Sequence, residues 1–273
     1  MQQKSICFIG GGNMAQAIIL GLLKTGYPPH LITVCDPNAD KLFYFAKQGV
    51  QTQPNNAVAA QQADVVLLAV KPQLMAEVCQ HLTQSAVDFS HKLVISIAAG
   101  ISLARLSALL PSATQVVRIM PNTPALVSEG MAGLYASPSL DIELKTFAEN
   151  LLSAVGKTCW VEKEEHMHTV TAASGSSPAY FFLLMEAMQN AITDLGFDQE
   201  TARLLIQQSA LGAAKMVIEN PEISLTTLRE NVTSKGGTTA AALDIFAQHD
   251  LSTTVQQAIH ACIQRSQEME TLF

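Results

Sequence analysis

The glycine-rich segment near the start of the chain constrains the fold more than any other feature. Gly10-Gly-Gly-Asn-Met-Ala15 follows an apolar run at residues 5–9 and precedes a helical pattern that reaches about Gly26. In this G-x-G-x-x-A arrangement Gly10 permits a tight turn, Gly12 lets the backbone approach a pyrophosphate, and Ala15 lets helix and strand pack closely. A second apolar run follows at residues 31–35. The segment predicts the first β-α-β unit of a dinucleotide-binding sheet.

The alternation of apolar runs and helical patterns continues to residue 161. Further apolar runs lie at residues 64–70, 93–97, 115–119, 131–135 and 158–161, and helical patterns lie at residues 55–62, 73–87, 102–110 and 140–155. Continuous runs such as Val65-Val-Leu-Leu-Ala-Val70 are typical of parallel strands that are covered on both faces. We therefore expect an α/β domain over residues 1–161, with the doubly wound sheet of the Rossmann type.

Strands disappear after about Glu162, and helical patterns occupy the rest of the chain. They cover residues 178–195, 198–219, 225–230, 240–248 and 253–269. The first two are apolar around most of their circumference, which is typical of buried helices. A short helical domain of a single chain offers few surfaces against which these two helices could be buried. We expect residues 162–273 to form an all-α domain that binds substrate. Two copies of this domain should form an intertwined homodimer, which is compatible with a larger homo-oligomer.

Composition excludes several classes of protein. Of the 273 residues 48% are hydrophobic and only 14% are charged, so much apolar surface must be hidden within or between subunits. No apolar run approaches the ~18 residues of a membrane span. The net charge of −7 argues against nucleic acid as a partner. The five cysteines lack CxxC spacing, as expected of reduced thiols. We expect a cytoplasmic protein without membrane or nucleic-acid partners.

Asp36 ends the second apolar run, twenty-one residues after Ala15. An acid at this position of a dinucleotide fold accepts hydrogen bonds from the adenosine ribose and repels the 2′-phosphate of NADP. Lys41 is the nearest cation that follows, and no Arg is close. The alternative is that Asp36-Pro37-Asn38 forms only a turn and a helix cap. We interpret Asp36 as a cofactor residue that favours NAD.

The segment Val232-Thr-Ser-Lys-Gly-Gly-Thr-Thr-Ala-Ala-Ala-Leu243 is the candidate substrate site. Gly236 and Gly237 leave the main chain bare, and N–H groups ahead of a helix expected from Ala240 have no intrahelical partners. Such a turn can hold a small carboxylate with backbone donors and hydroxyl groups. The alternative is an ordinary helix start with one of the two threonines as N-cap. Because a protonated imine needs mainly positioning, these groups suit an imine better than a ketone.

Five longer segments carry a resemblance to a known family. They are Phe8-Ile-Gly-Gly-Gly-Asn-Met-Ala15, Ala69-Val-Lys-Pro-Gln73, Arg118-Ile-Met-Pro-Asn-Thr-Pro124, Gly175-Ser-Ser-Pro-Ala-Tyr180 and Val232-Thr-Ser-Lys-Gly-Gly-Thr-Thr-Ala240. Over essentially its whole length the chain resembles pyrroline-5-carboxylate reductase. The resemblance implies that NADPH or NADH reduces the cyclic imine L-1-pyrroline-5-carboxylate to L-proline, the last step of proline biosynthesis.

The resemblance also implies roles for individual residues. The cofactor residues that it implies are Ile9, Gly10, Gly11, Gly12, Asn13, Met14, Asp36, Asn56, Ala69, Val70, Lys71, Pro72 and Ala98. The turn and the resemblance together give the substrate residues Gly236, Gly237, Thr238, Thr239, Glu164 and Glu222, with Thr239 as the catalytic group that hydrogen-bonds the ring nitrogen. Family members that use NADPH commonly carry a small polar residue at the position of Asp36. We therefore expect NADH to be used at least as well as NADPH.

Two other functions share this architecture. A hydroxyacid dehydrogenase needs a catalytic lysine early in the helical domain, where Lys163 is the one candidate before Lys215. A non-catalytic NAD-binding redox sensor would not need the glycine-threonine turn. We expect no metal site, because His166 and His168 do not share a helix face. Tyr180 is assigned to packing rather than to proton donation.

Overall fold

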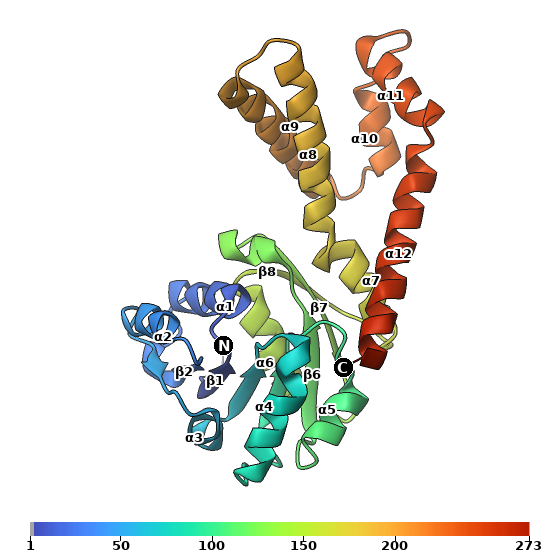
Figure 1. The fold of residues 1–273 in the computed structure, drawn as a ribbon. Helices are drawn as coiled ribbons and strands as arrows, with labels where there is room; N and C mark the ends of the chain where they lie inside the picture. Colours follow the sequence, from blue (N-terminus) through green and yellow to red (C-terminus); the bar gives the residue numbers. More distant parts are fainter. Residues whose placement is uncertain (1–2, 273) are drawn as a thin grey trace. The chain divides into compact units, whose positions relative to one another are not determined.

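The computed structural model describes residues 3–272, and its first compact unit is built on an eight-stranded sheet. The strand order is β3-β2-β1-β4-β5-β6-β7-β8, and β7 runs antiparallel to its neighbour β6 while the other neighbouring pairs are parallel. Figure 1 labels β1, β2, β6, β7 and β8 of this sheet. The first six strands follow the order of a doubly wound Rossmann sheet. The strands are β1 (Ile6–Ile9), β2 (Ile32–Cys35), β3 (Gln51–Thr52), β4 (Val65–Leu68), β5 (Leu93–Ser96), β6 (Gln115–Met120), β7 (Gly130–Ala136) and β8 (Gly156–Trp160). The predicted α/β class is confirmed.

Helices cover both faces of this sheet, as the continuous apolar strands predict. They are α1 (Asn13–Lys24), α2 (Ala39–Ala46), α3 (Asn56–Gln62), α4 (Pro72–Gln84), α5 (Leu103–Leu109) and α6 (Ile142–Ser153). Side chains of β1 alternate between two cores. Ile6 and Phe8 pack in one core with residues of α1 and α6, and Cys7 and Ile9 pack in the other with residues of α3, α4 and α5.

Helices make up the rest of the chain. They are α7 (His166–Val170), the π-helical turn η3 (Thr171–Gly175), α8 (Ser177–Asp194), α9 (Gln199–Glu219), α10 (Leu225–Asn231), α11 (Thr238–Gln248) and α12 (Leu251–Leu272). The second compact unit spans Ala179–His260, and the first unit takes residues up to 178 together with the end of α12. Strands end where the sequence predicts, near residue 161, but the boundary of 161 between two domains stays a prediction.

Two helix starts illustrate how the caps are made. Asp198 caps α9 as predicted, because its Oδ1 accepts a hydrogen bond from the N–H of Thr201 at 2.9 Å. The prediction for α11 is wrong by two residues. This helix begins at Thr238 rather than Ala240, and its N-cap is Gly237 rather than a threonine. A threonine N-cap would accept a hydrogen bond from a first-turn N–H through its hydroxyl group. Thr238 and Thr239 instead lie within the first turn of α11, and no side chain caps the helix.

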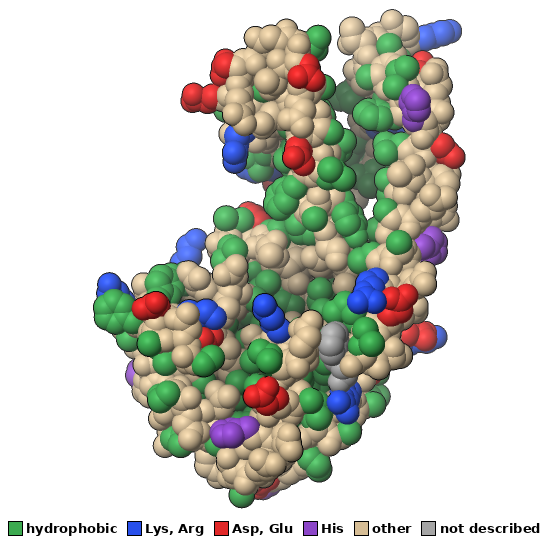
Figure 2. Space-filling model, in the orientation of Figure 1, with side chains coloured by type: hydrophobic (Ala, Val, Ile, Leu, Met, Phe, Trp, Pro, Cys, Tyr) green, Lys and Arg blue, Asp and Glu red, His purple; other side chains and the backbone are tan. Residues whose placement is uncertain are grey.

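The single chain leaves large apolar side chains of the second unit exposed. Phe181, Leu183 and Leu204 are 61%, 66% and 58% exposed. Figure 2 shows hydrophobic side chains gathered over these helices. Over the described residues, no helix combines the length and apolar character that a bilayer span requires. One chain therefore does not bury the apolar helices that the sequence predicts to be buried.

Candidate active site

The turn after β1 is closed between the strands on its two sides. The N–H of Gly10 donates to the carbonyl oxygen of Cys35 in β2 at 2.7 Å, and the N–H of Ala69, just after β4, donates to Ile9 at 2.8 Å. Gly10 has φ +103°, and a Cβ there would lie 2.5 Å from the carbonyl oxygen of Ala69. Only glycine satisfies both conditions at this position.

The space in front of α1 fits a dinucleotide pyrophosphate. Gly12 is the N-cap, no side chain caps the helix, and a Cβ on Gly12 would meet nothing within 4 Å. The first-turn N–H groups and the helix dipole favour an anion at this end of the helix. Asn13 is exposed and Met14 is half-buried at the same end. The residues present therefore satisfy the requirement that the backbone can approach a phosphate.

Asp36 holds the glycine turn as well as ending β2. Its Oδ2 accepts hydrogen bonds from the N–H of Gly11 at 2.8 Å and from Lys41 at 3.0 Å, and its Oδ1 accepts one from the N–H of Asn38 at 2.9 Å. The residue is only 6% exposed. Burial alone would raise the pKa of the Asp36 carboxyl group, but these N–H donors and the lysine outweigh burial and lower its pKa. Asp36 is therefore ionised. Its hydrogen bond from the N–H of Asn38 also forms the Asp36-Pro37-Asn38 turn, which was the alternative interpretation of this residue.

The remaining predicted cofactor residues lie at the carboxyl edge of the sheet. Val70 and exposed Lys71 connect β4 to α4, half-buried Pro72 begins α4, and Ala98 follows β5. Half-buried Asn56 begins α3, just after β3. Parallel strands present their carboxyl ends at one edge, and ligands of doubly wound sheets gather there. The structure therefore brings the predicted set together at this edge, while contact with a cofactor stays a prediction.

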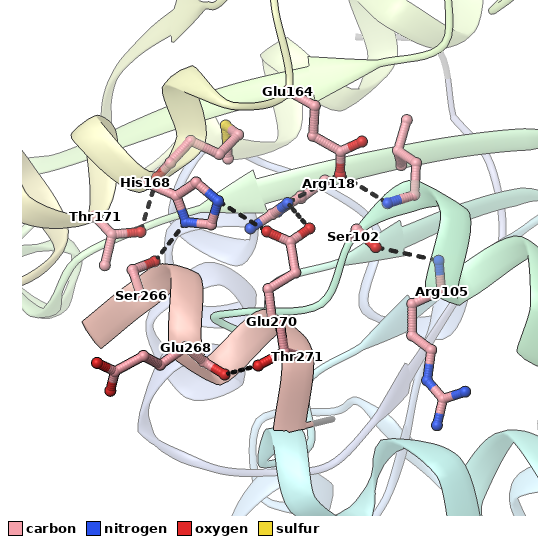
Figure 3. Close-up of polar contacts among 12 residues, drawn as sticks. Ser102, Arg105, Arg118, Glu164, His168, Thr171, Ser266, Glu268, Glu270 and Thr271 are labelled. Carbon is pink, nitrogen blue, oxygen red and sulfur yellow. Dashed lines mark hydrogen bonds and ion pairs between the residues drawn. The ribbon is translucent and has the colours of Figure 1, made fainter. Parts of the chain in front are cut away.

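A cluster of buried charges lies within the first unit, and the sequence patterns do not predict it. Arg118 of β6, which is 3% exposed, contacts Glu164 Oε1 at 2.9 Å and Glu270 Oε1 at 3.4 Å through Nη1. His168 contacts Glu270 Oε2 at 2.8 Å through Nε2 and Ser266 Oγ at 2.9 Å through Nδ1. Figure 3 shows these side chains facing one another. They join the sheet, α7 and the end of α12.

Glu164 therefore has structural partners in addition to its predicted place near the substrate. Its Oε1 accepts a hydrogen bond from the N–H of Leu103 at 2.7 Å as well as the contact from Arg118. The side chain stays 26% exposed. One signal could have revealed the cluster, since an arginine inside the apolar run of β6 requires a buried partner. Sequence spacing could not identify that partner, because Glu270 lies 152 residues away.

The loop after β6 is fixed by another buried residue, Asn122, which is 7% exposed. Its Nδ2 donates to the carbonyl oxygen of Ser174 at 3.0 Å, and its Oδ1 accepts from the N–H of Met131 at 2.8 Å. Ser174 lies in the π-helical turn, where a Cβ on Gly175 would come 2.5 Å from the Met120 methyl group. The loop is thus tied to β7 and to the residues that lead into α8.

The candidate substrate turn lies in the second unit. Gly236 has φ +72°, which favours glycine, and a Cβ on Gly237 would displace the Ser234 hydroxyl group and come 3.1 Å from the Ser234 carbonyl oxygen. No side chain caps α11, and Thr238 and Thr239 are exposed in its first turn. N–H groups and two hydroxyls are therefore available to a small anion.

Other predicted residues lie away from this turn along the chain. Glu222 is exposed in the connection between α9 and α10. A hollow of the same unit is lined by residues of α10, α11 and the start of α12, among them Arg229, Thr233 and Asp244. Gly236, Gly237, Thr238 and Thr239 do not line it. His166 is exposed, whereas His168 is buried in the charge cluster.

Comparison with known proteins gives matches over the whole chain. Residues 164–269 match the family model described as pyrroline-5-carboxylate reductase dimerisation, and residues 5–100 match the one described as NADP oxidoreductase, coenzyme F420-dependent. The pyrroline-5-carboxylate reductases of Pasteurella multocida and Haemophilus influenzae are each 65% identical to the chain, and each alignment covers 100% of both proteins.

Solved structures agree with these relatives. A pyrroline-5-carboxylate reductase from Coxiella burnetii superposes with a TM-score of 0.91 at 42% identity, covering 98% of this chain and 99% of the other. The Plasmodium falciparum pyrroline carboxylate reductase with NADP bound superposes with a TM-score of 0.88 at 26% identity, covering 99% of both chains. The resemblance in the sequence motifs is confirmed, and the chain belongs to the pyrroline-5-carboxylate reductase family.

Proposed function

We propose that the chain reduces L-1-pyrroline-5-carboxylate to L-proline, with NADPH or NADH as the hydride donor, as the last step of proline biosynthesis. The observation that carries this proposal is the 65% identity to two pyrroline-5-carboxylate reductases over the full chain. The open glycine turn ahead of α1 and the uncapped turn ahead of α11 support it. A hydroxyacid dehydrogenase and a redox sensor have no comparable support.

In the proposed mechanism the first unit binds the cofactor, and the bound nicotinamide supplies the hydride. Ile9, Gly10 and Gly11 shape the turn, and Gly12, Asn13 and Met14 present the N-terminus of α1 to the pyrophosphate. Asp36 and Asn56 bind the adenosine end. The other cofactor residues of the proposal are Ala69, Val70, Lys71 and Pro72 after β4 and Ala98 after β5.

The second unit binds the imine in this proposal. Gly236, Gly237 and Thr238 hold the substrate carboxylate at the start of α11, with the backbone N–H groups of Gly236 and Thr238 as donors, because the N–H of Gly237 donates to the Ser234 carbonyl oxygen at 3.0 Å. The protonated ring nitrogen donates a hydrogen bond to the Thr239 hydroxyl, which orients the C=N carbon. Glu222 of this unit supplies negative charge that favours the protonated, electrophilic form of the imine. Glu164, a residue of the first unit whose carboxylate pairs with Arg118, is a further substrate residue of the proposal.

We propose that NADH is used at least as well as NADPH. Asp36 is ionised and ends β2, where an acid favours a ribose with free hydroxyl groups. The Plasmodium falciparum relative was solved with NADP bound, so the family's fold accommodates that dinucleotide as well. Values of kcat/KM with each cofactor decide the matter, and a strong preference for NADPH would refute the role given to Asp36.

We further propose a cytoplasmic homodimer that is held together by the helical domain, residues 162–273. The exposed apolar side chains of α8 and α9 support the dimer, as does the match of residues 164–269 to a dimerisation model. The five free cysteines, three of them buried, support a reducing compartment.

The Thr239→Ala variant tests the substrate site. We expect kcat/KM for the imine to fall about 10- to 100-fold, the effect of losing a hydrogen bond to a charged group. Binding of NADH, measured by calorimetry, should not change. Thr146→Ala, which alters an exposed threonine of α6, serves as the control. Unchanged imine turnover by Thr239→Ala would show that another group orients the ring nitrogen.

A further inference from the structure

Lys41 of α2 contacts the carboxylate that is expected to select the cofactor. We infer that Lys41 is a specificity-determining residue that lets the site accept a 2′-phosphorylated dinucleotide beside NADH. This inference rests on the proposed function and deepens it, because it assigns the use of both cofactors to a pair of side chains. The pair is Lys41 Nζ and Asp36 Oδ2, 3.0 Å apart.

The carboxylate of Asp36 is largely used within the protein. The N–H groups of Gly11 and Asn38 and the ammonium of Lys41 occupy three of its roughly four acceptor positions. One position on Oδ1 is left for a ribose hydroxyl group. Asp36 is 6% exposed, so the carboxylate faces these donors more than it faces solvent. The Asp36 carboxylate therefore repels the 2′-phosphate of a dinucleotide less strongly when a cation lies beside it.

Lys41 supplies the offsetting charge at a place where a ligand can reach it. Its side chain is 45% exposed, and an ammonium group has three donors, of which Asp36 uses one. Asn38 fixes the start of α2, because its Oδ1 accepts hydrogen bonds from the N–H groups of Asp40 and Lys41. The Lys41 backbone is therefore held in place, and the side chain extends from a defined position.

The charge balance explains the expected preference. A phosphate monoester carries about −1.5 to −2 charges at neutral pH. Asp36 alone would repel it, whereas the Asp36–Lys41 pair is neutral and still has two ammonium donors to offer. The neighbouring Asp40 is exposed and adds one negative charge, so Lys41 is needed to balance this part of α2. Replacing Lys41 should lower kcat/KM with NADPH much more than kcat/KM with NADH.

The experiment compares the variants Lys41→Met, Lys41→Arg and Lys47→Met with the unaltered protein. Lys47→Met is the control, because this substitution also removes one positive charge at the end of α2. The Lys47 ammonium lies over the Phe43 ring, 4.3 Å from its centroid, and not beside Asp36. Binding of adenosine 2′,5′-bisphosphate and of 5′-AMP is measured by calorimetry. Values of kcat/KM with NADPH and NADH are measured in parallel.

We expect Lys41→Met to weaken adenosine 2′,5′-bisphosphate binding about tenfold, as for a lost hydrogen bond to a charged group. Binding of 5′-AMP should change less than about twofold on the same scale. Lys41→Arg should restore most of the difference, and Lys47→Met should change neither ligand. Equal losses for both ligands, or an equal effect of Lys47→Met, would overturn the inference. Failure to turn over the imine with either cofactor would instead refute the proposed function and leave the binding comparison interpretable.

Discussion

Arg118 is a cation in the interior of β6, where its neighbours along the chain are apolar. It is 3% exposed and has two carboxylate partners, Glu164 and Glu270. Removing one member of a buried ion pair leaves the other members without compensation, which is costly. The two carboxylates keep some contact with water, at 26% and 25% exposure, so hydration reduces the cost. Arg118 thus links β6 to the end of α12 through Glu270, together with the contacts of His168 to Glu270 and Ser266.

We expect Arg118→Met to lower the free energy of unfolding by about 3 kcal/mol, near the low end for a broken buried pair. Urea denaturation at neutral pH measures the change. Arg265→Met is the matched control, because Arg265 pairs with Glu268 at 2.8 Å while both side chains are exposed. That variant should lose at most about 1 kcal/mol. Equal losses for the two variants would show that the buried cluster does not stabilise the fold.

Single residues also show which parts of the site the sequence could predict. The positions of Gly10 after β1 and of Asp36 after β2 were predictable because they depend on neighbours in the chain: a strand, a turn and a helix in fixed order. Their contact with a cofactor stays a prediction. The contacts of Glu164 were not, because its partners Leu103 and Arg118 lie 61 and 46 residues away in the chain. The start of α11 was predicted two residues late, at Ala240, because the hydrophobic pattern does not show that Thr238 and Thr239 already have helical backbone angles.

Helix α1 packs against the segment after α6 at Gly21, with no room for a side chain there. A Cβ at this position would overlap Val155 and come 2.9 Å from the Ala154 carbonyl oxygen. Replacing glycine by alanine inside a helix ordinarily stabilises it by roughly 0.5–1 kcal/mol. Here the added methyl group has no room, so the close approach of α1 to the segment after α6 requires glycine.

We therefore expect Gly21→Ala to lower the free energy of unfolding by about 1–3 kcal/mol, the usual cost of overpacking. The double variant Gly21→Ala, Val155→Ala should lose less than the sum of the two single variants, because the smaller side chain makes room. Denaturation of all three proteins provides the coupling energy. Strict additivity would mean that the contact between the two positions does not set the spacing of the helix.

At the scale of the whole chain, the sequence predicts the order of elements better than their grouping. Strands and helices follow the hydrophobic pattern, because that pattern is local. The helices α2 and α7 escaped it, and so did two other features. The two-residue strand β3 is polar and lies at the sheet edge, and the end of α12 belongs to the first unit. The second feature arises from contacts such as Met269 against Gly100, which no local pattern encodes.

The second unit has apolar side chains at successive positions of α8, which a single neighbouring helix cannot cover. Phe181, Phe182 and Leu183 are 61%, 62% and 66% exposed, and successive residues point in directions about 100° apart. Surfaces of this kind require a partner that packs on more than one side of the helix, as in an intertwined dimer. A second copy of this chain offers the same apolar helices in return.

We expect the protein to sediment as a dimer or a larger even assembly at micromolar concentration. Leu183→Glu places a charge in the expected interface and should shift the protein towards monomer, because an unpaired buried charge is costly. Ile142→Glu, at a position of α6 that is 71% exposed, is the matched control and should leave the assembly unchanged. Sedimentation velocity over a concentration series distinguishes the species. A monomeric unaltered protein, or a Leu183→Glu variant that associates as tightly as the control, would contradict assembly through the α8 surface.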